Sequence, residues 1–278
     1  MNKAKSSKPF ALFTKWGRKE ATTFTGFCNY HDKITFQPIE DNNFNGSEEH
    51  IFLHTYRCMI HNFHEKREYT NFSDSLTSIH SLGMNSAASD IGIGFKSAVK
   101  DFLYVKDLFD SGLLNRDYSI LDYIIWEFDY PISFAGSSFE APTRDLYNNK
   151  IQNLRILNAR ASHIYITIFP ENDKSYCIIS WLKEDSMKLK SLTEQLTGLD
   201  FLEKRHFLNR QLVKNSDNLV FSPKLIDFMS LDERDNFGFM SQGSFLFDEL
   251  YDSIDDEDVP ILISDPMYDL FKNLSAIS

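Results

Sequence analysis

Side chains able to do chemistry gather in one short segment near the start of the chain, from Cys28 to Glu40. His31 and Asp32 stand between them, so a thiol, an imidazole and two carboxylates share this segment. Such groups are the usual ligands of Zn²⁺, and Cys28 and His31, three positions apart, supply half of a zinc site. The remaining ligands must come from another part of the chain.

A predicted helix further along carries suitable ligands. His54, Cys58 and His61 follow one another at spacings of four and three residues, which places them on one side of a helix. The predicted metal ligands are Cys28, His31, His54, Cys58 and His61. The cofactor expected on this hypothesis is a divalent metal, either Zn²⁺, Mg²⁺ or Mn²⁺.

The same segment is compatible with three other roles, which the sequence leaves open. Cys28 could act as a thiolate nucleophile with a nearby histidine as its base. Asp32, Glu40 and Glu65, together with the imidazole of His31, could hold Mg²⁺ or Mn²⁺ in a nuclease-like hydrolase. In the third role the segment is structural: the imidazole and Asp32 hydrogen-bond to the backbone, and Cys28 is a buried thiol.

An arginine on the same predicted helix should hold the segment in place. We expect the guanidinium of Arg57 to bridge to Asp32 or Glu40, because a bidentate arginine–carboxylate pair fixes geometry firmly. The predicted catalytic residues are His31, Asp32, Glu40 and Arg57.

The elements expected to position these residues are a loop and two helices. The segment 25–49 is rich in Gly, Pro and Asn, which predicts turns. Helices are expected near 48–69 and over 95–111, the second with Gly112 as its C-cap. The Ser-, Asn- and Gly-rich stretch 71–94 predicts a connection between them.

The middle of the chain predicts an antiparallel sheet. Isoleucines at every second position give the segment 163–170 a period of two, and a similar run at 175–182 follows after a short turn, which predicts a hairpin. The segment 119–139 is also rich in strand-forming residues. The connections are short, so the strands should be antiparallel.

Helices are expected again after the sheet, over 184–215, from Ser222-Pro223 onward, and over 264–274. The predicted fold class is α+β, with a helical N-terminal part, a central antiparallel sheet and a helical, acidic C-terminal part. The predicted division is 1–114, which carries the Cys/His/Asp segment, and 115–278, which holds the sheet and the C-terminal helices. One continuous domain is the alternative.

The segment from Ala21 to Glu40 also resembles a signature of uncharacterised bacterial proteins: Gly-Phe-Cys, two residues, His-Asp, and then Phe-x-Pro-Ile-Glu. The resemblance extends from Ala21 to Trp181 and includes the Tyr56-Arg57 pair on the following helix. Relatives often carry an upstream Cys-x-x-Cys element, which this chain lacks. Some relatives occur beside antiviral or mobile-element genes, so the resemblance implies a role in antiviral defence and no established reaction.

Composition excludes several classes of protein. Three cysteines in 278 residues are too few for a disulfide framework and indicate a reducing compartment. We find neither the apolar segment of a signal peptide nor a run of about 18 apolar residues, so we expect a cytoplasmic protein that does not bind a membrane. The Walker pattern and the nucleophile elbow are absent too.

Charge is distributed unevenly along the chain, whose net charge is −11. Residues 227–269 contain thirteen acidic residues and one basic residue, Arg234, whereas the first 33 residues are basic. A general nucleic-acid binder would be basic overall, so nucleic acid could contact only the basic N-terminus. The acidic stretch is a solvated face, a docking surface for a basic partner or a mimic of nucleic acid.

No catalytic motif is complete, and this favours a binding or regulatory protein. The predicted function is that of a component of a bacterial defence or conflict system, acting through a protein partner or as a homo-oligomer. The alternative is a metal-dependent, nuclease-like hydrolase that uses Cys28, His31, Asp32 and Glu40. A thiol enzyme based on Cys28 is the third hypothesis.

Overall fold

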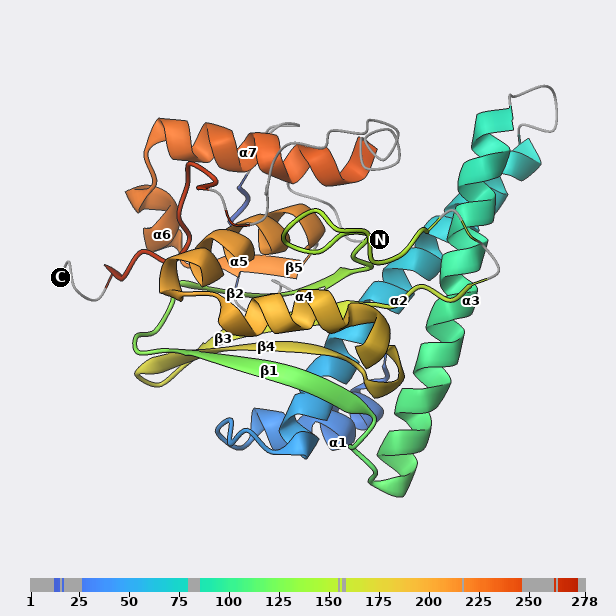
Figure 1. The fold of residues 1–278 in the computed structure, drawn as a ribbon, viewed down its shortest axis with the longest axis horizontal. Helices are drawn as coiled ribbons and strands as arrows, with labels where there is room; N and C mark the ends of the chain where they lie inside the picture. The colour runs from blue at the N-terminus through green and yellow to red at the C-terminus, as the bar shows by residue number, and fades with distance from the viewer. Residues whose placement is uncertain are drawn as a thin grey trace.

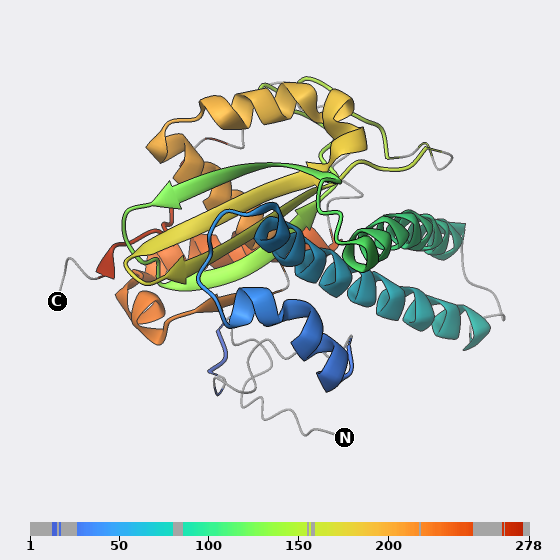
Figure 2. The same cartoon turned by 90° about the horizontal axis from the view of Figure 1, so that it is seen from below.

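The computed structural model describes residues 13–15, 17, 27–79, 86–154, 156, 159–216, 218–246, 263 and 265–274. In these residues a five-stranded sheet forms the middle layer, and helices pack on both of its faces (Figure 1). The view from below separates the N-terminal helices on one side of the sheet from C-terminal helices on the other (Figure 2). The predicted α+β class with a central antiparallel sheet is confirmed.

The strands of the sheet are all paired antiparallel. They span Leu121–Phe128 (β1), Phe134–Glu140 (β2), Ile164–Glu171 (β3), Lys174–Leu182 (β4) and Asn218–Phe221 (β5). Their order across the sheet is β1-β4-β3-β2-β5. β1 and β2 follow each other in the sequence, yet β4 and β3 lie between them. The connection from β1 to β2 must therefore cross the end of the β3–β4 pair.

The hairpin expected in the middle of the chain is confirmed. β3 and β4 pair with Glu171 opposite Lys174, so Asn172 and Asp173 form a two-residue turn. Asn172 has a φ of 54°, in the left-handed region that asparagine tolerates better than most residues. The two turn residues thus join the two strands that the sequence pattern predicted.

Alternation along the strands gives the sheet two covered faces. Ile164, Ile166 and Ile168 are buried in the cluster formed with the C-terminal helices. Tyr165 lies on the opposite face and is buried in the cluster formed with the N-terminal helices, where its ring packs edge-on against Phe109. Burial on both faces explains why these strands contain so few charged residues.

Three helices cover the N-terminal side of the sheet in the described residues: α1 (Asn29–Glu40), α2 (Glu48–Ile79) and α3 (Ser86–Asn115). α2 crosses the sheet, where the hydroxyl of Thr55 lies 2.7 Å from that of Ser180 on β4. α2 and α3 then run side by side and extend past the sheet (Figures 1 and 2).

The expectation of a loop over 25–49 is wrong for the middle of that segment, which forms α1. Phe36 is buried in the cluster of α2 and α3 and holds α1 against them. Pro38 lies in the last turn of α1 and has no N–H to donate to the carbonyl oxygen of Ile34, so α1 loses one internal hydrogen bond there. The turn-forming residues act after the helix, as at Gly46 with its φ of 70°.

The long helices also extend beyond their expected bounds. α2 continues to Ile79 and α3 begins at Ser86, so most of the predicted connection 71–94 is helical. This stretch contains glycines, and each glycine inside a helix destabilises it by about 1 kcal/mol relative to alanine. Packing between the helices, such as the contact of the Phe63 and Phe102 rings, offsets that cost.

The position of Gly112 predicted a C-cap, and this prediction is wrong. Gly112 lies within α3, where an added Cβ would stand 2.8 Å from the carbonyl oxygen of Asp117 and 3.0 Å from the ring of Phe52. The residue that adopts a left-handed conformation after the helix is Arg116, with a φ of 55°. Gly112 is therefore required for close approach and not for a turn.

Further helices cover the opposite face of the sheet: α4 (Ser186–Gly198), α5 (Phe201–Asn215), α6 (Pro223–Phe228) and α7 (Leu231–Leu246). The helices expected over 184–215 and from Pro223 onward are confirmed. Asp200 separates α4 from α5 and forms a capping box with Glu203, which explains the break between them.

The helix expected over 264–274 is wrong: the described residues of this range form an irregular segment along α5. Asp265 and Asp269 each accept a hydrogen bond from the backbone N–H two residues further on. The N–H of Leu270 donates to the side chain of Asn209 on α5. Side chains that bind the local backbone in this way compete with helix formation.

Some expectations fall on residues outside the described ones. These are residues 247–262 of the acidic stretch 227–269 and most of the basic first 33 residues. The predicted boundary after residue 114 lies at the end of α3, and α2 packs directly on the sheet. The division into two parts stays a prediction. Within the described part of the chain, we find no helix long and apolar enough to cross a lipid bilayer.

Candidate functional site

The thiol and imidazole of the predicted cluster meet at the start of α1. Cys28 is the residue before the helix, and its Sγ lies 3.1 Å from Nδ1 of His31. Both side chains are exposed, and the ring of Tyr30 lies edge-on against the imidazole. This pair is half of the predicted metal site, or a thiol beside a possible base.

The other end of α1 carries the ion pair that the sequence predicted. Arg57 of α2 donates to Glu40 at 2.5 Å, and its guanidinium lies over the Phe36 ring at 4.2 Å from the centroid. The expected bridge is thus confirmed with Glu40 as the carboxylate. Asp32 lies in the first turn of α1, where a carboxylate is favourable beside the helix N-terminus.

The predicted catalytic residues are therefore divided along one helix. His31 and Glu40 are nine residues apart in α1, which corresponds to about 13 Å along the helix axis. His31 lies beside Cys28, whereas Glu40 lies beside Arg57. The segment does not form one catalytic centre.

The predicted ligands on α2 are engaged in the interior. His54 stacks on Phe169 of β3, with ring centroids 4.6 Å apart, and burial together with the charge of Arg57 lowers its pKa to about 3. Cys58 is buried, and its thiol donates to the carbonyl oxygen of Ser138 on β2. Burial raises the pKa of the Cys58 thiol to about 12.

The five predicted metal ligands consequently do not converge. His54 packs on β3 and Cys58 on β2, while Nδ1 of His61 lies 3.7 Å from Glu65, one turn further along α2. Among the residues that the structure describes, no three His, Cys, Asp or Glu side chains are placed to hold one metal ion. Cys28 and His31 are the members of the predicted set that are in contact.

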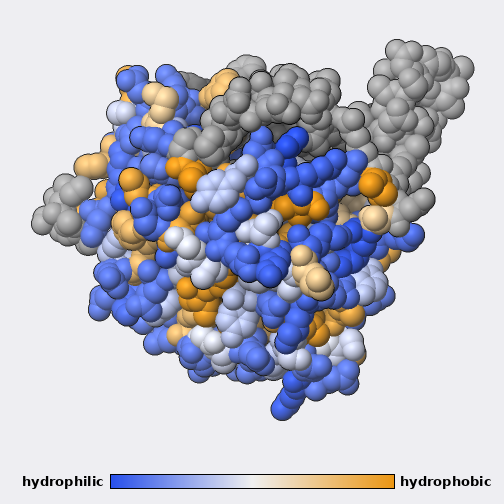
Figure 3. Space-filling view, in the orientation of Figure 1, coloured by the Kyte–Doolittle hydropathy of each residue, from blue (hydrophilic) through white to orange (hydrophobic). Residues whose placement is uncertain are grey.

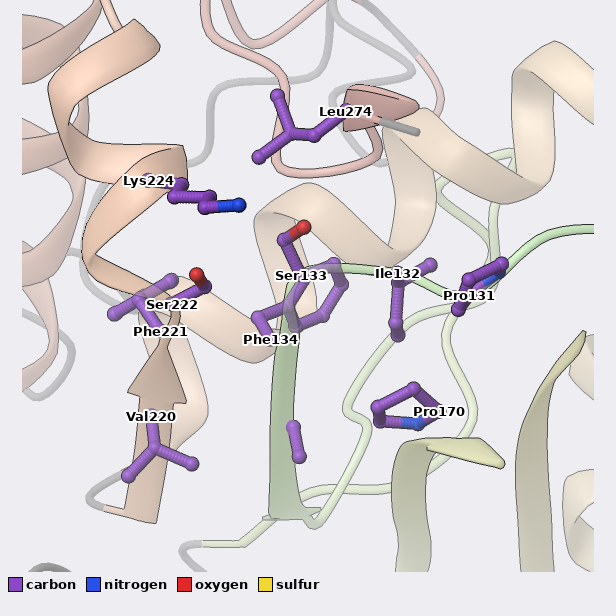
Figure 4. Close-up of a pocket in the computed structure, with 11 residues that line it drawn as sticks. Pro131, Ile132, Ser133, Phe134, Pro170, Val220, Phe221, Ser222, Lys224 and Leu274 are labelled. Atoms are coloured by element: carbon purple, nitrogen blue, oxygen red, sulfur yellow. The ribbon is translucent and has the colours of Figure 1, made fainter. Parts of the chain in front are cut away.

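A different feature, which the sequence did not suggest, is a hollow of about 610 Å³ at one end of the sheet. We call it the β2–β5 hollow (Figure 4). It is lined by Pro131, Ile132, Ser133, Phe134, Ala135, Pro170, Val220, Phe221, Ser222, Lys224 and Leu274.

The strand register explains how this hollow is built. Phe134 pairs with Phe221 of β5, and the pairing of Gly136 with Ile168 places Pro170 of β3 on its other side. Three apolar side chains therefore stand in one row across the sheet, because cross-strand neighbours share a face. No local pattern could signal the site, since its lining comes from segments far apart in the sequence.

Hydrogen bonds hold the rim of the β2–β5 hollow in place. The hydroxyl of Ser175 on β4 accepts from the N–H of Ile132 at 2.8 Å and donates to the carbonyl oxygen of Tyr130 at 2.9 Å. The N–H of Ser222 donates to the carbonyl oxygen of Ser133 at 2.7 Å. The connection from β1 to β2 is thus fixed across the sheet end, so the hollow is preformed.

The hollow carries one charge. Lys224 is the charged residue among its lining, and no ion pair or hydrogen bond joins it to another described residue. Its ammonium and the hydroxyl of Ser133 both point into the space beneath Leu274 (Figure 4). An exposed cation beside an apolar surface is suited to a ligand with an apolar part and a negative charge.

A second hollow, of about 200 Å³, has a structural explanation. It is lined by Arg205, His206, Asn209 and residues of the C-terminal segment. Arg205 forms an ion pair with Asp269, and Nδ1 of His206 lies 3.0 Å from the carbonyl oxygen of Ile263. These groups hold the C-terminal segment on α5.

The face of the molecule shown in Figure 3 is mainly hydrophilic, and its apolar side chains form small, separate groups. Scattered apolar side chains of this kind are normal on protein surfaces.

Comparison of the chain with protein-family models, with curated proteins and with solved structures gave no match. The resemblance of the segment around Cys28 to a bacterial signature therefore stays a prediction.

Proposed function

We propose that the chain is a binding protein that acts through a protein partner, and that the β2–β5 hollow is its contact site. The observation that carries this proposal is the chemistry of the lining, which contains apolar residues, two serines and one lysine, with no His, Cys, Asp or Glu. No hydrogen bond between described residues joins Lys224 to Ser133 or Ser222, as a nucleophile and its base would require. The lining suits binding better than catalysis.

A charge placed in the hollow tests this proposal. Leu274 lines the hollow and is only partly buried, so Leu274→Glu should fold and should still repel an apolar partner. Leu114→Glu is the matched control, because Leu114 is 83% exposed on α3 and lies outside the hollow. The tagged chain should co-purify with a protein encoded beside it, and only Leu274→Glu should abolish that association. Equal behaviour of both variants would reject the site.

Membership of a bacterial defence system and a cytoplasmic location belong to the same proposal. The first rests on the resemblance around Cys28 alone. The second is supported by the three cysteines, which are all unpaired thiols, since thiols persist in reducing compartments. To test the defence role, the chain would be expressed together with the proteins encoded beside it, and the cells would be challenged with virus. Failure of these wild-type proteins to protect the cells would count against the defence role.

The alternative, a metal-dependent hydrolase, would have to be built on the contact between Cys28 and His31. The described residues bring no third ligand to that pair. We therefore expect elemental analysis to find no stoichiometric metal, and we expect chelation with EDTA to leave the thermal midpoint unchanged. Stoichiometric zinc that is lost in His31→Ala, but retained in His61→Ala, would restore the metal hypothesis.

A further inference from the structure

We infer that the β2–β5 hollow binds the carboxyl-terminal residue of a partner protein, with an apolar side chain in the hollow and the terminal carboxylate beside Lys224. The inference rests on the proposed function and names the partner's chemistry. It is carried by a lysine without a described partner at the edge of a preformed apolar hollow.

Lys224 is a lysine of the described residues that has no ion pair. Lys106, Lys174 and Lys272 each form an ion pair with a carboxylate. Acidic residues outnumber basic ones by eleven in the whole chain. None lines the hollow. An ammonium that points into an apolar hollow without a carboxylate in its lining is complementary to an anion supplied from outside.

The surroundings of the lysine select the kind of anion. Phe134, Phe221 and Pro170 form the row across the sheet, and Leu274 faces them from the C-terminal segment. An inorganic anion would leave this apolar surface unused. A ligand that joins a carboxylate to an apolar group can contact both at once, and burial of that group supplies the binding free energy.

A chain terminus meets this requirement in one residue. Its Cα carries both the carboxylate and the side chain, so the two groups reach the ammonium and the apolar row together. The hydroxyls of Ser133 and Ser222 stand beside the lysine as donors for the second carboxylate oxygen. Capture of a terminal carboxylate is an established mode of peptide recognition. A fatty acid shares the same chemistry and is an outcome of the test.

The test uses the full-length protein and fluorescein-labelled hexapeptides of Gly and Ser that end in Leu, Val, Phe or Ser. Each peptide is made with a free carboxylate and with a terminal amide, and binding is followed by fluorescence polarisation. We expect the peptides ending in Leu, Val or Phe to bind more tightly than the one ending in Ser. We expect amidation to weaken their binding by about tenfold or more, the loss of one charge-assisted hydrogen bond.

The role of Lys224 is measured by comparing the acid and amide forms of the same peptides. Lys224→Met keeps the length and apolar stem of the side chain and removes the charge. This variant should bind the acid and the amide with equal affinity, whereas Lys100→Met, at an exposed position of α3, should retain the tenfold preference. Circular dichroism and the thermal midpoint check that each variant is folded.

Three results would overturn the inference: equal binding of acid and amide by the wild type, an undiminished preference in Lys224→Met, or binding of decanoate without binding of any peptide. The last would assign the hollow to a free fatty acid. Suppose instead that Leu274→Glu abolishes partner association while amidation changes nothing. The proposed function would then stand and this inference alone would fail.

Discussion

Sγ of Cys28 lies 3.1 Å from Nδ1 of His31 at the exposed start of α1, whereas the other two cysteines are buried. Burial raises the pKa of Cys58 to about 12 and raises that of Cys177 as well, so neither ionises near neutral pH. Iodoacetamide should therefore label one cysteine in the native protein, as measured by intact mass. Cys28→Ser should remove the label and Cys58→Ser should retain it. Labelling of two sites in the native state would contradict this assignment.

The ion pair between Arg57 and Glu40 should contribute little by charge. Both side chains are more than a third exposed, so Glu40→Gln should lower the free energy of unfolding by less than about 1 kcal/mol. Arg57→Ala should cost more, because it also removes the contact with the Phe36 ring. In urea denaturation, the double variant should resemble Arg57→Ala. A further loss in the double variant would show that Glu40 has another role.

Stability should fall in acid because two histidines are buried in the neutral form. Burial lowers the pKa of His54 and of His163 to about 3, with Arg57 near the first and Arg160, Lys66 and Lys188 near the second contributing through their positive charge. An unfolded histidine titrates near 6.5. Between these values the unfolded chain binds more protons, so stability is full above about pH 6.5 and decreases as the pH falls toward 3.

Variants of single histidines separate this effect from general acid denaturation. The ring of His163 packs against the rings of Phe102 and Phe139, and its Nδ1 is buried without a hydrogen-bond partner among described residues. His163→Phe should fit this space and reduce the pH dependence of the free energy of unfolding, measured by urea denaturation, by about 1.4 kcal/mol per pH unit between pH 6 and 4. An unaltered slope in His163→Phe would mean that this histidine is protonated in the native state.

The close approach at Gly112 predicts a large effect for a small substitution. Gly112→Ala places a methyl group against the Asp117 carbonyl and the Phe52 ring and should destabilise the protein by about 1–3 kcal/mol. Gly198→Ala in α4 meets no atom within 4 Å and should be neutral or stabilising by up to about 1 kcal/mol. Thermal midpoints measure both changes. A neutral Gly112→Ala would show that α3 can shift away from the loop after it.

The strands were predictable because their signal is local. Ile164, Ile166 and Ile168 share a face in any strand, and the short turn after them specifies a hairpin without reference to the rest of the chain. α1 and the segment from Asp265 were not predictable in this way. Burial of Phe36 against α2 overrides the turn propensity around α1, and Asn209 on α5 binds the backbone of the final segment. Both effects depend on tertiary contacts.

The candidate site was also predictable only where its contacts are local. The contact of Cys28 with His31 and the pairing of Arg57 with Glu40 follow from short spacing and from complementary charge. Their separation could not be read from the sequence, because it depends on the segment being helical. The β2–β5 hollow has no sequence signal at all. Strand register and the crossing of the β1–β2 connection bring Pro131, Pro170 and Lys224 together.

The β1–β2 connection crosses the end of the β3–β4 hairpin, and Ser175 holds it there. We expect β1 and β2 to join the sheet after that hairpin has formed, because pairings between distant parts of a chain cost more loop-closure entropy than a two-residue hairpin. On this expectation the β2–β5 hollow is completed late in folding. A ligand bound there stabilises the native state but not the transition state for folding, so it should lower the unfolding rate constant and leave the folding rate constant almost unchanged.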